Sequence, residues 1–142
     1  WGHNPLPWPQ DHERPGPACY CGKHGCIETF LSGPALARDH AAHGGSEASA
    51  SEIAAAAAAG DARARSTLER YADRLARSLA TVIDVLDPDV IVLGGGVSNV
   101  AWLYEAVPAR WGAWVFSDRV DTALRPAAHG DSSGAWLTYG WR

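Results

Sequence analysis

The sequence predicts an α/β protein, and three of its features lead to this expectation. Apolar residues at helical spacing run up to Leu86, the short apolar stretch Val90–Leu93 follows, and the turn Gly94–Gly96 comes directly after it. Helix, strand and glycine turn in this order are typical of layered α/β folds. The chain of 142 residues is also long enough to bury one sizeable core.

Residues 1–27 are expected to form an irregular loop. Prolines recur in this stretch, and proline opposes a helix or a central strand because it has no backbone N–H to donate. They are Pro5, Pro7, Pro9, Pro15 and Pro17. A long loop without secondary structure is uncommon in a compact domain, so we expect a bound metal to hold this one together.

All three cysteines of the chain lie in this loop, as Cys19, Cys21 and Cys26, with glycines between them that allow tight turns. Zinc binds four ligands tetrahedrally, and three cysteines with one histidine are a recurrent structural set. The alternatives are three reduced thiols, or one disulfide and one free thiol. Zinc is favoured, because an odd cysteine number fits disulfides poorly and Cys19 and Cys21 are too close to bridge comfortably.

Three histidines compete for the fourth zinc position. We prefer His3, because His24 lies inside the cysteine turn and would have to fold back sharply. His12 stands among charged residues and is expected to be solvated. The predicted metal ligands are therefore His3, Cys19, Cys21 and Cys26.

Glu28 follows the last cysteine closely, so a metal-held loop would fix its carboxylate in space. A carboxylate accepts hydrogen bonds from two donors, which suits the vicinal hydroxyls of a ligand. The alternative is a carboxylate that only stabilises a helix N-terminus through the helix dipole.

Several helices are expected further along the chain. Residues 28–40 carry a helical pattern that Ser32-Gly33-Pro34 should bend or restart. Ser49 and Glu52 form a capping box that opens an alanine-rich helix over residues 53–59. Asp61 should cap the longest helix, which ends before Pro88 and directs its arginines outward.

The stretch Val90–Leu93 should form a strand that is buried on both faces. The glycines after it, 94–96, are a candidate nucleotide turn, because glycines at the end of a buried strand let backbone amides approach a ligand. A purely structural turn is the alternative, since neither a P-loop nor a G-x-G-x-x-G pattern is present. Beyond it we expect Ser98 or Asn99 to cap a helix reaching Val107, strands at 115–116 and 120–124, a loop at 129–134 and an apolar segment over 135–141.

Composition narrows the functional classes. The net charge of −4, without basic clusters, argues against nucleic-acid binding by this chain. No apolar run approaches the roughly 20 residues of a membrane-spanning helix, and thiols arranged for a metal fit a reducing compartment, so we expect a cytoplasmic protein. The sequence opens on Trp1 and contains no methionine, so we also expect it to be part of a longer protein.

Three motifs in the chain resemble, in the same order, the ROK family of sugar kinases and sugar-responsive repressors. They are Gly2-His3, the stretch Cys19-x-Cys21-Gly22-x-x-Gly25-Cys26-x-Glu28, and Val92–Ser98. Residues 1–8 and 27–33 look most like the bacterial fructokinase or mannokinase branch. The resemblance implies the C-terminal lobe of an actin-like ATPase fold of the hexokinase type, related to ribonuclease H, with a zinc loop over 1–27 and helices and short strands over 28–142.

The resemblance also implies a site. The implied ligands of a structural zinc are His3, Cys19, Cys21 and Cys26; His3 and Glu28 would face hexose hydroxyls, and Gly94, Gly95 and Gly96 would lie beside Mg-ATP. No catalytic residue is assigned in this chain, because the family's N-terminal phosphate-binding loop and its aspartate general base have no counterpart here.

The implied activity of the intact protein is ATP-dependent phosphorylation of fructose, mannose or a related hexose, at the 6-hydroxyl. We expect the intact protein to be a homodimer and this chain alone to be inactive. Two alternatives belong to the same resemblance. One is a sugar-sensing repressor, whose DNA-binding helix-turn-helix would lie upstream, and the other is a non-catalytic sugar-binding remnant.

Overall fold

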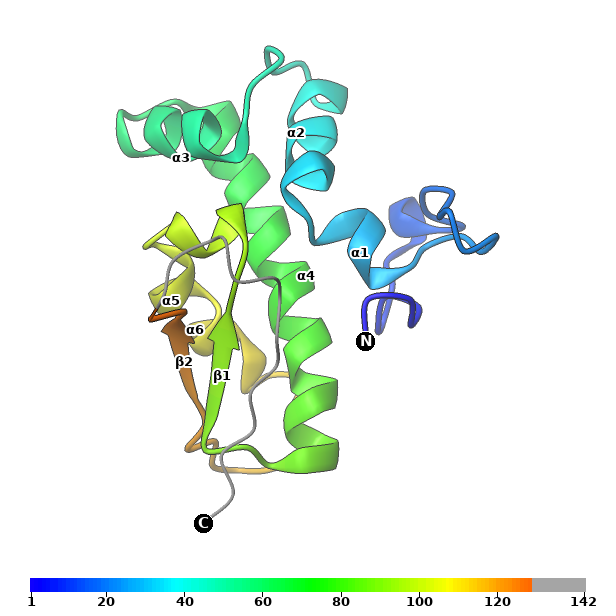
Figure 1. Cartoon of the computed structure of the whole chain (residues 1–142), viewed down its shortest axis with the longest axis vertical. Coiled ribbons are helices and arrows are strands. Elements are labelled where there is room, and N and C mark those ends of the chain that lie inside the picture. The colour runs from blue at the N-terminus through cyan, green and yellow to red at the C-terminus, as the bar shows by residue number, and fades with distance from the viewer. Residues whose placement is uncertain (129–142) are drawn as a thin grey trace.

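The computed structural model describes residues 1–128, in which a long helix runs alongside a pair of strands and shorter helices flank both (Figure 1). The helices are α1 (Ile27–Phe30), α2 (Gly33–Ala42), α3 (Ala50–Ala58), α4 (Ala62–Leu86), α5 (Leu103–Ala106) and α6 (Pro108–Trp111). The strands are β1 (Val90–Leu93) and β2 (Ala123–Pro126), and the 3₁₀ helices are η1 (Asp11–Glu13) and η2 (Gly96–Asn99). This content confirms the predicted α/β class.

The longest helix, α4, begins and ends where the sequence predicts. The Asp61 side chain caps it and accepts a hydrogen bond from the Ala64 amide at 2.7 Å. The helix ends at Asp87, whose φ of 41° lies in the left-handed region, directly before Pro88. None of the helices within residues 1–128 is both long enough and apolar enough to cross a bilayer, and this includes α4.

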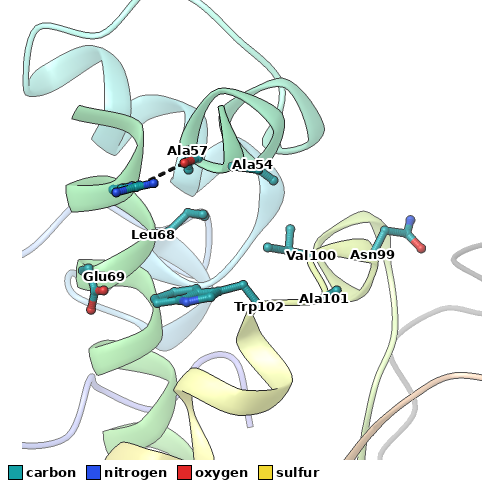
Figure 2. A pocket seen from close by; sticks show the side chains of 10 residues that line it. Ala54, Ala57, Leu68, Glu69, Asn99, Val100, Ala101 and Trp102 are labelled. Carbon is teal, nitrogen blue, oxygen red and sulfur yellow. Dashed lines mark hydrogen bonds between the residues drawn. The ribbon is translucent and has the colours of Figure 1, made fainter. Parts of the chain in front are cut away.

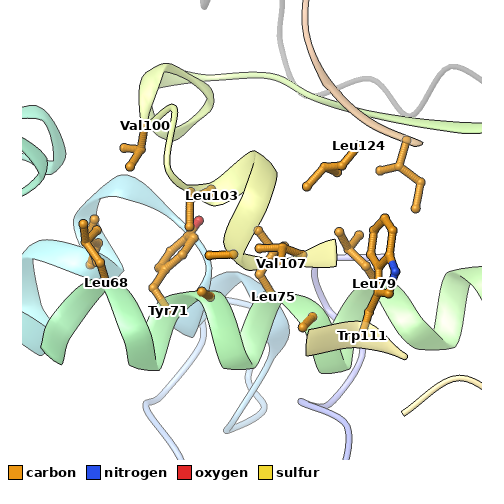
Figure 3. Close-up of a cluster of buried hydrophobic side chains, with 14 of the residues drawn as sticks. Leu68, Tyr71, Leu75, Leu79, Val100, Leu103, Val107, Trp111 and Leu124 are labelled. Atoms are coloured by element: carbon orange, nitrogen blue, oxygen red, sulfur yellow. The ribbon is translucent and has the colours of Figure 1, made fainter. Parts of the chain in front are cut away.

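One face of α4 forms the main core. Figure 3 shows Leu68, Tyr71, Leu75 and Leu79 along this face, opposite side chains from the segments that follow β1. The opposing residues are Val100, Leu103, Val107, Trp111 and Leu124. Burying one such side chain contributes about 1.5–3 kcal/mol, so this contact stabilises the long helix against the strand layer.

The strands β1 and β2 pair in parallel, with Val90 opposite Ala123. The segment between them, from η2 to α6, supplies the crossover that a parallel pair requires. Ile91 is buried toward the core, whereas Val92 and Leu93 are only partly buried among the described residues. The prediction that β1 is buried on both faces is therefore wrong for this part of the chain, and Ile91, Val92 and Leu93 all line a cavity.

The segment after β1 corrects further predictions. Ser98 and Asn99 lie inside η2 and cap no longer helix, because the Ser98 hydroxyl donates back to the Gly95 carbonyl at 2.6 Å. The expected helix reaching Val107 forms only as α5, Leu103–Ala106, and a separate helix, α6, begins at Pro108, which has no N–H to continue the ladder. Residues 115–116 form no strand; the Phe116 amide instead donates to Asp84 at 2.8 Å.

The second predicted strand, over 120–124, is displaced toward the C-terminus. It forms as β2, Ala123–Pro126, because pairing with β1 sets its register. The predicted loop at 129–134 and the apolar segment over 135–141 lie outside the described residues.

Caps fix the shorter helices near the site. Ser32 caps α2 by accepting a hydrogen bond from the Ala35 amide at 3.3 Å, with Pro34 in the first turn. The predicted capping box is confirmed, since Ser49 and Glu52 hydrogen-bond each other's backbone amides. It opens α3 at Ala50, slightly earlier than the predicted residue 53.

The N-terminal loop is attached to α4 through buried charges. Glu13 is 5% exposed and accepts hydrogen bonds from Arg74 at 2.7 Å and from Arg77 at 2.9 Å. Arg77 is completely buried, so the prediction that the α4 arginines point outward is wrong for Arg74 and Arg77. The carboxylate that the loop brings to them satisfies their charge, which periodicity along one helix does not reveal.

Candidate metal and ligand site

The predicted metal ligands come together in the N-terminal loop. One potential ligand atom from each of His3, Cys19, Cys21 and Cys26 lies within 4.8 Å of the others. The His3 Nδ1 atom is 3.5 Å from Cys19 Sγ, and the sulfurs of Cys21 and Cys26 are 3.6 Å apart. A tetrahedral zinc with bonds of 2.0–2.3 Å needs ligand separations of about 3.5–3.8 Å, so the donor set fits that ion. The alternative histidines His12 and His24 are not in this group.

The backbone of the loop converges because glycine stands where other residues would clash. Gly25 has a φ of +67°, and a Cβ there would lie 2.8 Å from the Pro15 carbonyl oxygen. Hydrogen bonds from the Cys19 amide to the Lys23 carbonyl, 2.8 Å, and from the Gly22 amide to Cys19, 2.9 Å, close the turn between the first cysteines and the third. Backbone geometry thus places all three sulfurs on one side of the turn.

The thiols of the site differ in acidity. A backbone hydrogen bond from Lys23 to its sulfur lowers the pKa of exposed Cys21 to about 7. Burial raises the pKa of the Cys26 thiol to about 11, and the neighbouring sulfurs act in the same direction. A metal that binds all three sulfurs must therefore displace the Cys26 proton at neutral pH.

The second nitrogen of His3 faces away from the sulfurs. Its Nε2 atom is 2.8 Å from the Tyr20 hydroxyl and 3.6 Å from Glu28 Oε2. If Nδ1 binds a metal, the imidazole proton lies on Nε2, which then donates a hydrogen bond outward. His3 thus joins the metal group to a second group of polar atoms.

Glu28 stands in the first turn of α1, as the helix-dipole alternative predicts, and it also reaches a cavity. Its amide donates to the Gly2 carbonyl at 2.9 Å, which fixes the carboxylate beside the start of the chain. The cavity of about 590 Å³ is lined by Glu28 together with the turn Gly94–Gly96. The tertiary structure therefore brings two predicted binding elements to one space.

The turn Gly94–Gly96 forms one wall of this cavity. Gly95 has a φ of +78°, a backbone conformation that favours glycine. This agrees with the alternative interpretation, in which the glycines serve a structural turn. Among residues 1–128, no atom lies within 4 Å of a Cβ placed at Gly95 or Gly96. The turn therefore leaves open space in front of its backbone, where a ligand can approach.

A second cavity, of about 510 Å³, lies between α3, α4 and the segment after η2 (Figure 2). Ala54, Ala57, Leu68 and Trp102 line it, and Arg65 donates to the Ala57 carbonyl at 3.0 Å. It contains none of the predicted site residues. Sequence patterns did not indicate it, because its lining comes from three separate segments.

Two residues next to the site were missed by sequence analysis. Tyr20 contacts His3, and Glu13 anchors the loop to α4. An aromatic residue placed between two metal-ligating cysteines is a signal that could have indicated Tyr20. The sequence around Glu13 does not indicate this anchoring role, because its arginine partners are more than 60 positions away.

Fold and site together give an α/β chain with a four-residue group suited to a metal beside a cavity. The ROK family model matches residues 1–137, and the chain belongs to the ROK family. A curated relative, the N-acetyl-D-glucosamine kinase of Vibrio vulnificus (strain YJ016), is 38% identical over 116 residues. That match covers 82% of this chain but 38% of the relative, so the chain spans well under half of that kinase.

Solved structures in the family include both a kinase and a regulator. A ROK family glucokinase from Streptomyces griseus, in complex with glucose and AMPPNP, has a TM-score of 0.76 and 26% identity, covering 94% of this chain and 47% of that one. A ROK family transcriptional regulator, a homolog of the E. coli MLC protein, has a TM-score of 0.69 and 26% identity, covering 85% of this chain and 33% of that one. The kinase similarity supports the predicted actin-like lobe.

Proposed function

We propose that this chain is the C-terminal half of an ATP-dependent hexose kinase. The observation that carries the proposal is the single cavity lined by both Glu28 and the turn Gly94–Gly96. A sugar kinase has to hold a polyhydroxyl acceptor and a nucleotide side by side, and a carboxylate opposite a glycine turn suits both tasks. The similarity to the N-acetylglucosamine kinase and the glucokinase supports the same class.

Each site residue then has a role. Glu28 and the Nε2 atom of His3 bind neighbouring sugar hydroxyls, as acceptor and donor respectively. Gly94, Gly95 and Gly96 let their backbone approach Mg-ATP. Transfer of the γ-phosphoryl group is an in-line displacement that depends on positioning and charge stabilisation, and its aspartate base lies in another part of the intact kinase.

Zinc is the proposed structural metal of the loop. His3, Cys19, Cys21 and Cys26 would hold it, and four protein ligands leave no open position for activating water. Its contribution is to fix the loop, and with it His3 and Glu28, against the sugar. Protein purified without added metal is expected to contain about one zinc per chain, measured by elemental analysis.

An assay with several hexoses can identify the sugar that the kinase phosphorylates. ADP release by the full-length protein, measured with fructose, mannose, glucose and N-acetylglucosamine, should be strong with at least one of them. Residues 1–8 and 27–33 favour fructose or mannose, whereas the similar kinases act on N-acetylglucosamine or glucose by name. No activity with any of the four sugars would contradict the kinase.

A sugar-sensing repressor is the second candidate function, and the similarity to the ROK transcriptional regulator supports it. Repressor and kinase would share this lobe and its sugar site. DNA binding by the full-length protein, released by sugar and without ADP formation, would establish the repressor.

Replacing Glu28 by glutamine should weaken sugar binding about 10- to 100-fold. The change keeps the size of the side chain but removes a charged acceptor, whose hydrogen bonds contribute about 1.5–3 kcal/mol. Titration of the chain with each hexose, followed by NMR, measures the effect. Glu47→Gln is the matched control, because Glu47 is exposed and outside the cavity. Equal affinities for the two variants would remove Glu28 from the sugar site.

A further inference from the structure

In the sequence, Tyr20 stands between Cys19 and Cys21, two of the predicted metal ligands. Its side chain lies edge-on to the His3 ring, with centroids 4.9 Å apart, and its hydroxyl is 2.8 Å from His3 Nε2. Yet Tyr20 is 83% exposed. Since burial contributes little to holding it, the contact with His3 is the main interaction that places this ring.

The Nε2 atom has one proton to give. In the tautomer that leaves Nδ1 available for a metal beside Cys19 Sγ, the ring proton is on Nε2, which then donates to the Tyr20 hydroxyl 2.8 Å away. Glu28 Oε2 lies 3.6 Å from the same nitrogen, beyond a normal hydrogen bond. A ligand hydroxyl that reaches His3 and Glu28 together therefore needs the proton that Tyr20 already accepts.

We propose that Tyr20 is a positioning residue for His3. Its hydroxyl occupies the position at His3 Nε2 that a sugar hydroxyl takes when the sugar binds. This inference rests on the proposed function of the same site. The sugar hydroxyl replaces the Tyr20 hydroxyl at Nε2, and the tyrosine side chain, which is largely exposed already, rotates into solvent. Until then the tyrosine keeps the imidazole oriented for both the metal and the sugar.

The Tyr20→Phe variant tests this proposal because it retains the ring and removes only the competing hydroxyl. In the variant a water, rather than a tethered hydroxyl, has to leave Nε2. We expect the affinity of the chain for its hexose to rise about two- to tenfold, the range of one net hydrogen bond. Zinc content should stay at the wild-type level, which separates displacement from a merely structural role.

NMR titration of the chain labelled with ¹⁵N-histidine gives both readouts in one experiment. The His3 Nε2–H signal should differ between the free wild-type and Tyr20→Phe proteins and become the same once each is saturated with sugar. Tyr104→Phe is the control, because the Tyr104 hydroxyl donates to the Ser98 carbonyl and not to His3. This control should show no gain in sugar affinity.

The outcomes distinguish the inference from the function on which it rests. Unchanged or weaker sugar binding by Tyr20→Phe, while Glu28→Gln still abolishes most binding, would overturn the role of Tyr20 and leave the sugar site intact. Loss of zinc from Tyr20→Phe would make Tyr20 a structural support and also overturn the proposal. Absence of binding by the full-length wild-type protein to all four hexoses would contradict the proposed function itself.

Discussion

Replacing Glu13 by alanine is expected to destabilise the chain by about 3–5 kcal/mol, because it leaves buried arginines without their carboxylate. Glu13 accepts from Arg74 at 2.7 Å and from Arg77 at 2.9 Å, and the exposure of the three residues is 5% or less. Arg77 would retain Asp73 at 3.0 Å and Arg74 would retain Asp39 at 2.9 Å, but both of these carboxylates are more exposed than Glu13. The loss also weakens the attachment of the N-terminal loop to α4, which then depends on hydrogen bonds from Arg77 to the Pro7 and Trp8 carbonyls.

Urea unfolding of the wild-type and variant chains measures this effect. Glu105→Ala is the control, since Glu105 is exposed and should change the unfolding free energy by less than about 0.5 kcal/mol. Glu13→Gln, which keeps the volume and some hydrogen bonds, should fall between the two if the alanine variant does not fold. A loss below about 1 kcal/mol for Glu13→Ala would contradict the anchoring role.

The same carboxylate should make stability depend on pH. Burial alone would raise the pKa of Glu13, but hydrogen bonds from Arg77 and Arg74 outweigh it and hold the pKa at about 2, below the ordinary 4.5. Because the folded-state pKa is lowered, this stabilisation is complete above about pH 4.5 and is lost as the pH falls toward 2. Urea midpoints measured across this range should decline more steeply for the wild type than for Glu13→Gln.

Replacing Cys26 by serine should lower zinc affinity at least about 100-fold, since a buried thiolate ligand is exchanged for a weakly binding hydroxyl. Cys26 is 1% exposed and its sulfur is 3.6 Å from that of Cys21. Competition with a chromophoric chelator measures the affinity, and elemental analysis the content.

His24→Ala provides a sharp control for the metal site. His24 lies in the same turn but outside the four-ligand group, so this variant should keep its zinc. Loss of zinc from His24→Ala with retention in His3→Ala would assign the fourth position to His24 and disprove the proposed ligand set. Wild-type protein without zinc, with three freely titrating thiols, would exclude the metal site altogether.

Features that depend on residues a few positions apart were predictable from the sequence. Asp61 caps α4 and the Ser49–Glu52 box opens α3, because capping needs only a side chain and the amides of the next turn. The cysteine group was predictable for the same reason, since glycines confine the three sulfurs to one turn. His3 was the only predicted ligand from outside that turn, and it was preferred because His24 would have to fold back sharply and His12 was expected to be solvated.

Breaks in the later elements were not predicted, although some have local causes. Pro108 begins α6 and separates it from α5, and this proline is visible in the sequence. The sequence contains no comparable local signal for the position of β2, because the register of β2 is set by pairing with β1, which lies far earlier in the chain.

The sequence by itself determined α3 and α4 with their caps, the α/β order and the identity of the candidate metal ligands. Only the tertiary structure decided that Arg74 and Arg77 face inward, because the Glu13 that satisfies them is distant in sequence. It also decided that Glu28 and the turn Gly94–Gly96 line one cavity. Periodicity and spacing report the neighbours of a residue along its own element, whereas charge pairs and cavities depend on which elements pack together.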